Sequence, residues 1–351
     1  MRKSYFVSVI LFVVATYSYG SIFVPFSKKK LSYMGRLETV QNQYAKFYWP
    51  ETSVTINFKG TEINAILKNG LEETYFYAIV DGKEIEAKKI KADTTKSTIL
   101  LAKGLKNTNH SVQLFKLSNN TSYTYFYGFE LANGSKVLKP ASLPQRKIEF
   151  YGNSITAGHG LDVQPGDDGS GSPYYFNNYW TYAAHTARHF NAQYSCISRS
   201  GIGIMVSWFP EIMPKIYDRL SPADLTRKWN FSKYTPDIVV INLYKNDSWL
   251  VNNPKHPQFI ARFGTTPPTE SFIIESYQNF IKSIRTQYPT SSIICALGSM
   301  DATKAGSAWS GYIEKAVKDL NDSKIYTHFF AYKDTPGHKS SRTESYSRRF
   351  D

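Results

Sequence analysis

Apolar and polar residues alternate in short runs along the first part of the chain, as in residues 54–58 and 75–80. Alternation with a period of two is typical of β-strands that bury one face. Turn signals separate the runs, and the pair Asp81-Gly82 is an example whose residues tolerate the positive φ of a tight hairpin. Residues 21–144 are therefore predicted to form an antiparallel β-sandwich domain.

After Gln145 the pattern changes to apolar strands that alternate with helical segments. Strands are expected at residues 147–151, 193–197, 237–243, 292–297 and 324–332. Helices are expected at residues 179–190, 270–288 and 311–320, and the second of these has a capping residue at Thr269 and a stop at Pro289. Such alternation is typical of a parallel sheet covered by helices. Residues 145–351 are therefore predicted to be a doubly wound α/β domain.

The first twenty residues have the order of a secretory signal. Basic Arg2 and Lys3 precede an apolar stretch at residues 5–16, and small, turn-forming residues follow up to Gly20. A buried helix or a single membrane anchor is the alternative, but the stretch is short for a membrane span. We predict a signal peptide at residues 1–20, a secreted or periplasmic protein, and no stable membrane insertion after its removal.

The chain is basic, with 42 Lys and Arg against 28 Asp and Glu and a formal net charge of +14. Such an excess often indicates a polyanionic partner. The basic residues are scattered through turns and solvent-facing positions without an aromatic-interleaved basic stripe, so nucleic acid is not the expected partner. An exported protein can instead meet acidic or sulfated polysaccharide.

No metal site is predicted. His185 and His189 have the i, i+4 spacing of zinc ligands on a helix, but Thr186 stands where a metalloprotease needs a glutamate. Cys196 and Cys295 fall in strongly apolar segments. They are predicted to be buried thiols rather than a disulfide or a metal pair.

Four polar or flexible residues follow predicted strands, at the edge where doubly wound sheets bind ligands. They are Ser154, Gly201, Asn246 and His338. Ester cleavage requires a nucleophile, a base and donors for the developing oxyanion. Ser154 can be the nucleophile, His338 the general base, and the Gly201 backbone N–H and the Asn246 side chain the donors. Read singly, an N-capping serine, a turn glycine and a loop asparagine are ordinary alternatives.

These residues also carry a family resemblance. Gly152-Asn153-Ser154-Ile155-Thr156, Gly201, Asn246-Asp247 and His338 resemble, in this order, the four blocks of the SGNH (GDSL-type) hydrolases. With the preceding β-rich region, the chain resembles carbohydrate esterase family two, which pairs an N-terminal jelly roll with an SGNH domain. The resemblance implies removal of acetyl groups from sugar hydroxyls, commonly at the 6-position of glucose- or mannose-type units, without a metal or organic cofactor.

Three positions depart from the family pattern. Asn153 stands where an aspartate is usual, and Tyr244 replaces the glycine of the Gly-x-Asn-Asp block. Asp334 lies four residues before His338 instead of the typical three. Either Asp334 still orients the imidazole of His338, which gives a triad, or a backbone carbonyl does so and the machinery is a dyad.

Aromatic residues after the strands are candidates for sugar binding. Trp208, Trp249 and Trp309 lie downstream of predicted strand ends, where flat faces can stack on sugar rings. Tyr244 is expected to make the pocket wall beside Asn246 bulkier. Core packing is the alternative for each tryptophan, and we expect only one of the three to bind sugar.

The leading hypothesis is an exported serine esterase that removes O-acetyl groups from a polysaccharide or oligosaccharide. An esterase or acyltransferase of the same fold that acts on lipids or peptidoglycan is the enzyme alternative. A carbohydrate-binding protein with a degenerate hydrolase domain is the non-enzyme alternative, which the residues at Asn153 and Tyr244 keep open.

Overall fold

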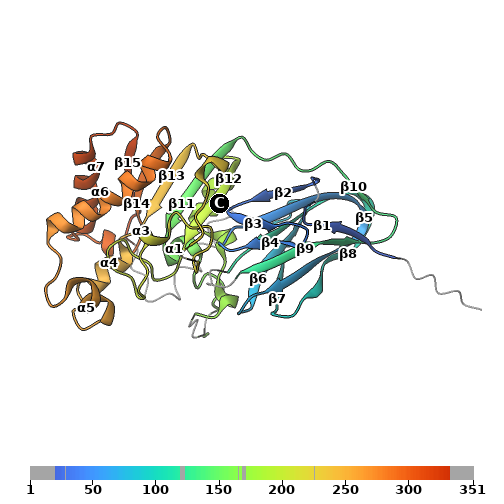
Figure 1. Cartoon of the computed structure of the whole chain (residues 1–351), viewed down its shortest axis with the longest axis horizontal. Helices are drawn as coiled ribbons and strands as arrows, with labels where there is room; N and C mark the ends of the chain where they lie inside the picture. The colour runs from blue at the N-terminus through green and yellow to red at the C-terminus, as the bar shows by residue number, and fades with distance from the viewer. Residues whose placement is uncertain are drawn as a thin grey trace, which may run out of the picture.

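Two sheets, one antiparallel and one parallel, follow one another along the chain and along the long axis of the molecule (Figure 1). The structure is a computed structural model that describes residues 20–27, 29–118, 123–164, 166–167, 171–224 and 226–332. The predicted signal peptide lies outside the described residues except for Gly20. The prediction of an α/β fold preceded by a β domain is confirmed.

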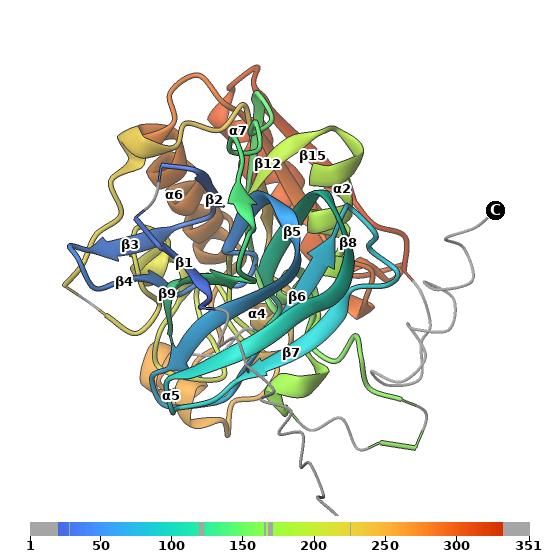
Figure 2. The same ribbon diagram turned by 90° about the vertical axis from the view of Figure 1, so that its right-hand side faces the viewer.

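The antiparallel sheet contains ten strands. They are β1 (Ile22–Pro25), β2 (Leu31–Met34), β3 (Leu37–Val40), β4 (Tyr44–Phe47), β5 (Ser53–Asn69), β6 (Thr74–Val80), β7 (Lys88–Ala92), β8 (Ser97–Lys116), β9 (Thr124–Leu131) and β10 (Lys136–Val137). The main order is β3-β4-β9-β5-β8-β6-β7, and β1, β2 and β10 pair at its sides. The long strands β5 and β8 pair along most of their length with register shifts near Gly60 and Ile63, and the sheet curls into a half-barrel (Figure 2).

Inward phenylalanines fill this half-barrel, because alternate strand residues point to the same face. Phe47, Phe58, Phe76 and Phe126 are each fully buried in it. The hairpin signal at Asp81-Gly82 is also confirmed: both residues have positive φ, and the Lys83 N–H donates to the Val80 carbonyl.

The parallel sheet contains five strands in the order β12-β11-β13-β14-β15. They are β11 (Arg146–Gly152), β12 (Ala192–Ser198), β13 (Ile238–Asn242), β14 (Ser292–Leu297) and β15 (Ile325–Phe329). All four pairings are parallel. The five predicted strands are therefore present, and β15 ends earlier than the expected residue 332.

Helices cover both faces of this sheet, as a doubly wound domain requires. The α-helices are α1 (Ser154–Ala157), α2 (Tyr182–His189), α3 (Met213–Ile216), α4 (Lys245–Leu250), α5 (Pro257–Phe263), α6 (Glu270–Gln287) and α7 (Trp309–Leu320). Short 3-10 helices are η1 (Pro173–Tyr175), η2 (Asn178–Trp180), η3 (Phe231–Lys233) and η4 (Asp301–Thr303). Phe150 of β11 packs with α2 on one face, whereas Tyr151 packs with α6 on the other. Thr269 caps α6 as expected, since its side chain accepts from the Phe272 N–H.

The two halves of the chain share buried contacts. Arg36, from the link between β2 and β3, is 1% exposed and pairs with Glu149 of β11 at 2.5 Å. Its guanidinium also donates to the Tyr151 hydroxyl at 2.9 Å, and the Trp49 indole donates to the Leu220 carbonyl at 3.0 Å. A buried ion pair of this kind leaves a costly unpaired charge when one partner is removed. The half-barrel is therefore packed against the parallel domain and is not a loosely tethered module.

Cys196 and Cys295 are buried free thiols, as predicted, and burial raises the pKa of each to about 12. Within the described ranges, His, Cys, Asp and Glu residues form no group of three that can hold a metal ion. None of the helices in those ranges is long and apolar enough to cross a membrane.

Candidate active site

The carboxyl edge of the parallel sheet brings three of the predicted site residues onto neighbouring loops. The last residue of strand β11, Gly152, pairs with Ser198 of β12 on one side and Asn242 of β13 on the other. Ser154 follows two residues after Gly152, whereas Gly201 and Asn246 follow the partner strands. The Arg199 N–H donates to the Gly152 carbonyl at 3.2 Å and joins two of these loops.

Ser154 is the first residue of the one-turn helix α1 and is partly exposed. The N-cap is Asn153, whose side-chain oxygen accepts from the Ile155 N–H at 3.0 Å, so Ser154 is not the capping residue. The departure from the usual aspartate thus preserves an N-cap acceptor. Among the described residues, the buried Asn153 Nδ2 has no hydrogen-bond partner.

We call residues 152–158 the nucleophile segment. Two glycines allow its turn. A Cβ on Gly152 would lie 2.0 Å from the Thr156 hydroxyl oxygen. Gly158 ends α1 at φ +80°, and a Cβ there would lie 2.4 Å from the Asn177 carbonyl oxygen. Both positions therefore require glycine, for close approach at Gly152 and for close approach and backbone conformation at Gly158.

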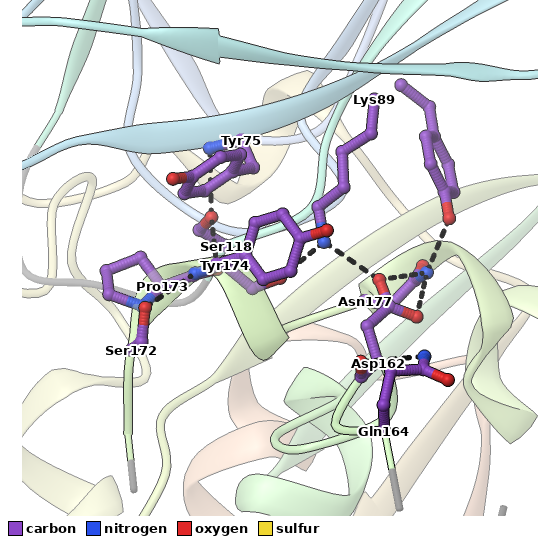
Figure 3. A network of polar contacts seen from close by, with 10 residues as sticks. Tyr75, Lys89, Ser118, Asp162, Gln164, Ser172, Pro173, Tyr174 and Asn177 are labelled. Carbon is purple, nitrogen blue, oxygen red and sulfur yellow. Dashed lines mark hydrogen bonds and ion pairs between the residues drawn. The ribbon is translucent and has the colours of Figure 1, made fainter. Parts of the chain in front are cut away.

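A polar network connects the chain after the nucleophile segment to the half-barrel (Figure 3). Asn177 Nδ2 donates to the Asp162 carboxylate at 2.9 Å and to the Tyr77 hydroxyl at 2.7 Å. Lys89 Nζ, from β7, pairs with Asp162 at 2.8 Å and donates to the Tyr174 carbonyl. Sequence reasoning missed this network because its partners are separated by up to 100 residues and join strands of the half-barrel to the chain between α1 and η2.

Gly201 lies in the loop after β12 with φ +82°. A Cβ at this position would meet Phe209 at 3.2 Å and Trp208 at 3.3 Å, so glycine is favoured here both sterically and conformationally. His159 joins this loop from the nucleophile side, because its Nδ1 lies 3.1 Å from the Ser200 hydroxyl. The loop thus lies against the turn that carries Ser154.

Asn246 is 3% exposed near the start of α4, and its amide is held from both ends. Its Nδ2 donates to the Ile202 carbonyl at 2.7 Å, and its Oδ1 accepts from the Trp208 indole at 3.1 Å. An amide nitrogen carries two hydrogens, and the bond to Ile202 uses one of them. The fixed amide can therefore donate its second hydrogen to a substrate oxygen.

Asp247 ties down the loop after β12. Its carboxylate accepts the backbone N–H groups of Ile204, Met205 and Val206 at 2.7 to 3.1 Å. Gly203 makes room for it, since a Cβ there would lie 2.5 Å from Asp247 Oδ2. Complete burial raises the pKa of Asp247 to about 6, although the three amides oppose the shift.

Tyr244 and Trp309 lie in the core, which corrects their expected place in sugar binding. Tyr244 is fully buried at φ +76°, and its hydroxyl donates to the Ile273 carbonyl of α6. Its ring packs 4.7 Å from that of Tyr277 and 5.3 Å from that of Trp309, which is 8% exposed. The side chain packs against α6 and α7 in the core, so it does not line an open pocket beside Asn246.

The other two predicted aromatic residues keep exposed surface. Trp208 is 46% exposed, and its ring meets that of His256 edge-on at 5.1 Å. Trp249 is partly exposed, and its indole donates to Asp301 at 2.6 Å. Lys245 lies over the Trp249 ring at 4.2 Å and forms an ion pair with Asp301, and burial lowers the pKa of Lys245 to about 7. Lys245 and Asp301 were not anticipated from the sequence.

The predicted base His338 and its orienting residue Asp334 lie outside the described residues. The described chain leaves β15 at the same edge that carries Ser154. The Phe330 N–H donates to the Leu297 carbonyl at 3.0 Å, and Lys304 lies 5.7 Å from the ring centroid of Tyr332. His338 follows six residues after Tyr332.

Comparisons with known proteins agree with this architecture. Residues 33–140 match the family model for the carbohydrate esterase 2 N-terminal domain. The chain is 33% identical over 309 residues to the cellulase/esterase CelE of Acetivibrio thermocellus, covering 86% of this chain but 35% of the relative's length. It is 22% identical over 305 residues to an acetylxylan esterase / glucomannan deacetylase of Cellvibrio japonicus, covering 86% of this chain and 80% of that protein.

A solved structure matches most of the chain. It is a family two carbohydrate esterase from Clostridium thermocellum in complex with cellohexaose, with 32% identity, a TM-score of 0.75, and coverage of 87% of this chain and 89% of that one. The fold is thus an SGNH-type hydrolase domain behind a curled antiparallel β domain. The chain belongs to carbohydrate esterase family two, a family of carboxylic ester hydrolases.

Proposed function

We propose that this protein is an exported carbohydrate O-acetylesterase in which Ser154 is the nucleophile. The observation that carries the proposal is the convergence of Ser154, Gly201 and Asn246 on adjacent loops at one sheet edge. The curated relatives are named as esterases, two of them as acetylxylan esterase / glucomannan deacetylase. The secretory pattern of residues 1–20 supports export.

In the proposed mechanism, the Ser154 oxygen attacks the acetyl carbonyl while His338 takes the serine proton. The tetrahedral intermediate carries its negative charge on the former carbonyl oxygen. It collapses when His338 returns the proton to the sugar oxygen, which leaves as an alcohol. Water, activated by His338, then attacks the acetyl-serine and releases acetate.

The oxyanion donors are the Gly201 backbone N–H and the second N–H of the Asn246 amide. The bonds of Asn246 to Ile202 and Trp208 fix the amide before substrate arrives. A donor that does not have to reorient stabilises the developing charge more strongly than water does. Trp208 combines this contact with an exposed ring face, so it is our candidate for stacking on a sugar.

Acetate release from acetylated xylan, acetylated glucomannan and an aryl acetate tests the proposal. Ser154→Ala should lower kcat by about 10³-fold or more, since the nucleophile is lost. The matched control is Ser291→Ala, which removes a buried serine at the opposite edge of the sheet, where its hydroxyl bonds the Pro236 carbonyl. Equal acetate release by wild type and Ser154→Ala would refute the nucleophile assignment.

A second pair of variants tests the base. His338→Asn should abolish turnover, whereas His328→Asn, at an exposed position of β15, should leave it unchanged. Asp334→Asn then separates the two forms of the machinery. A loss of about 10³-fold or more indicates a triad, and a small loss indicates a dyad.

A further inference from the structure

The outward surface of β4, β9 and their neighbours carries a cluster of tyrosines and lysines that the proposed chemistry does not use. We call it the tyrosine-lysine face, and its residues are Tyr44, Lys46, Lys68, Lys96, Tyr125 and Tyr127. Tyr125 and Tyr127 are partly exposed, whereas Phe126 between them is fully buried. The alternation places both tyrosines on the side of β9 away from the half-barrel core.

The tyrosine rings form a continuous aromatic group across two strands. The centroid of the Tyr44 ring on β4 lies 4.5 Å from that of Tyr125 and 5.8 Å from that of Tyr127. The Tyr125 and Tyr127 rings are 6.4 Å apart and tilted by only 31°, so their faces point in similar directions. Figure 1 shows β4 and β9 side by side in the half-barrel, away from α4 to α7.

Three lysines from different segments lie over these rings. Lys46 of β4 and Lys68 of β5 lie 5.5 and 5.9 Å from the Tyr125 centroid, and the exposed Lys96, just before β8, lies 4.0 Å from that of Tyr127. These are cation–π distances. Within the described part of the chain, none of the three ammonium groups forms an ion pair with a carboxylate.

Glu38 interacts with the charge of Lys46 on this face, but it is shared with partners outside the face. Glu38 lies opposite Lys46 across β3 and β4, but its carboxylate is bound by the Tyr48 hydroxyl at 2.6 Å and by Arg227. Glu130 lies three residues beyond Tyr127 along β9. The face is therefore locally positive, in line with the net charge of +14 of the chain.

We infer that the tyrosine-lysine face is a second glycan-binding surface that binds an anionic polysaccharide, one whose sugars carry carboxylate or sulfate groups. Partly exposed tyrosine rings offer apolar faces with a polar hydroxyl, and such rings pack on the C–H faces of sugars. The lysines then pair with the acidic groups of the same chain. This function is independent of Ser154 and would hold the polymer beside the esterase domain.

The test measures binding, by affinity electrophoresis and calorimetry, to polygalacturonate, to carrageenan and to neutral glucomannan. Ser154→Ala protein is used alongside wild type, so that deacetylation does not change the ligand. Tyr127→Ala and Lys96→Gln should each weaken binding to an anionic polymer about fivefold, the scale of one stacking or surface charge contact. The two anionic polymers distinguish a carboxylate from a sulfate ligand, and higher salt should weaken binding to either.

Two matched controls lie elsewhere on the surface: Tyr326→Ala at an exposed position of β15 and Lys282→Gln on α6. They should bind as wild type does. The alternative function of the tyrosines is cross-strand stabilisation of the sheet. A Tyr127→Ala protein with a lower Tm and unchanged polysaccharide binding would overturn the inference. The inference would also be overturned if Lys96→Gln bound the anionic polymers as well as Lys282→Gln does. Lys96 is exposed, so its substitution does not endanger the fold.

Discussion

The nucleophile segment, residues 152–158, and the asparagine segment, residues 244–247, occupy equivalent positions after neighbouring strands but are built differently. The nucleophile segment depends on two glycines and a local cap from Asn153. The asparagine segment begins with a tyrosine at φ +76° and is held by side-chain bonds to a loop about 40 residues away. Local rules thus shape the first segment, and tertiary contacts shape the second.

Within the asparagine segment, the largest expected effect comes from removing the amide of Asn246. Asn246→Ala should lower kcat on an aryl acetate by about 10²- to 10³-fold, the usual loss for one oxyanion donor. Asn252→Ala, six residues after Asn246, is the matched control, because its amide also donates to a backbone carbonyl, that of Ser248. Near-normal kcat in Asn246→Ala would mean that the segment is a structural clamp and not an oxyanion donor.

Substitution of Tyr244 tests whether its burial or its left-handed backbone conformation has the larger effect on stability. Tyr244→Gly relieves a left-handed conformation worth roughly 1–2 kcal/mol but removes a buried aromatic side chain worth roughly 3–5 kcal/mol. The variant should therefore be less stable by about 1–4 kcal/mol in urea unfolding.

Asn321→Gly is the control for the conformational part of that balance. Asn321 ends α7 at φ +49° and is exposed, so glycine relieves the backbone there without loss of core packing. It should change the free energy of unfolding by a few tenths of a kcal/mol at most. A Tyr244→Gly protein as stable as wild type would show that the tyrosine ring contributes little to the core.

The fold and the nucleophile segment could be predicted from the sequence because their signals are local. The hydrophobic pattern predicted where the five parallel strands lie along the chain. The Gly152-Asn153-Ser154 turn lies directly at the end of β11, where the sequence places it. The packing of Tyr244 could not be predicted, since nothing local shows that α6 and α7 cover its face of the sheet. Trp208 and Trp309 likewise both follow strands, yet tertiary packing leaves one 46% and the other 8% exposed.

The carboxylate of the asparagine segment should make stability depend on pH. Burial raises the pKa of Asp247 to about 6 in the folded protein, above its ordinary value near 3.8. Between these values the folded state keeps a proton that the unfolded state has lost, so the contribution of Asp247 to stability is greatest below the lower value and falls as pH rises toward 6. The slope approaches about 1.4 kcal/mol per pH unit.

Asp247→Asn removes this slope while keeping an acceptor for the backbone amides. The free energy of unfolding of the variant relative to wild type should therefore rise between pH 4 and pH 6 and level off above that range. Asp319→Asn, at an exposed position of α7, is the control. Parallel pH profiles for wild type and Asp247→Asn would contradict the assignment.

The smallest expected effect comes from substitutions of Trp208. This residue both holds the Asn246 amide and offers an exposed ring, and two variants separate these contributions. Trp208→Phe keeps an aromatic face but loses the indole N–H that donates to Asn246 Oδ1 at 3.1 Å. The amide then becomes freer to rotate, so kcat should fall about five- to tenfold, consistent with one hydrogen bond of ~1 kcal/mol, while KM for acetylated glucomannan stays close to wild type. Trp208→Ala should lower kcat by a similar factor and also raise KM for the polymer, because the stacking face is gone.

If Trp208→Phe retains full kcat, the bond to Asn246 does not position the amide. The amide of Asn246 is then held by its bond to the Ile202 carbonyl, and the long-range bonds of Asp247 hold the loop that carries this carbonyl.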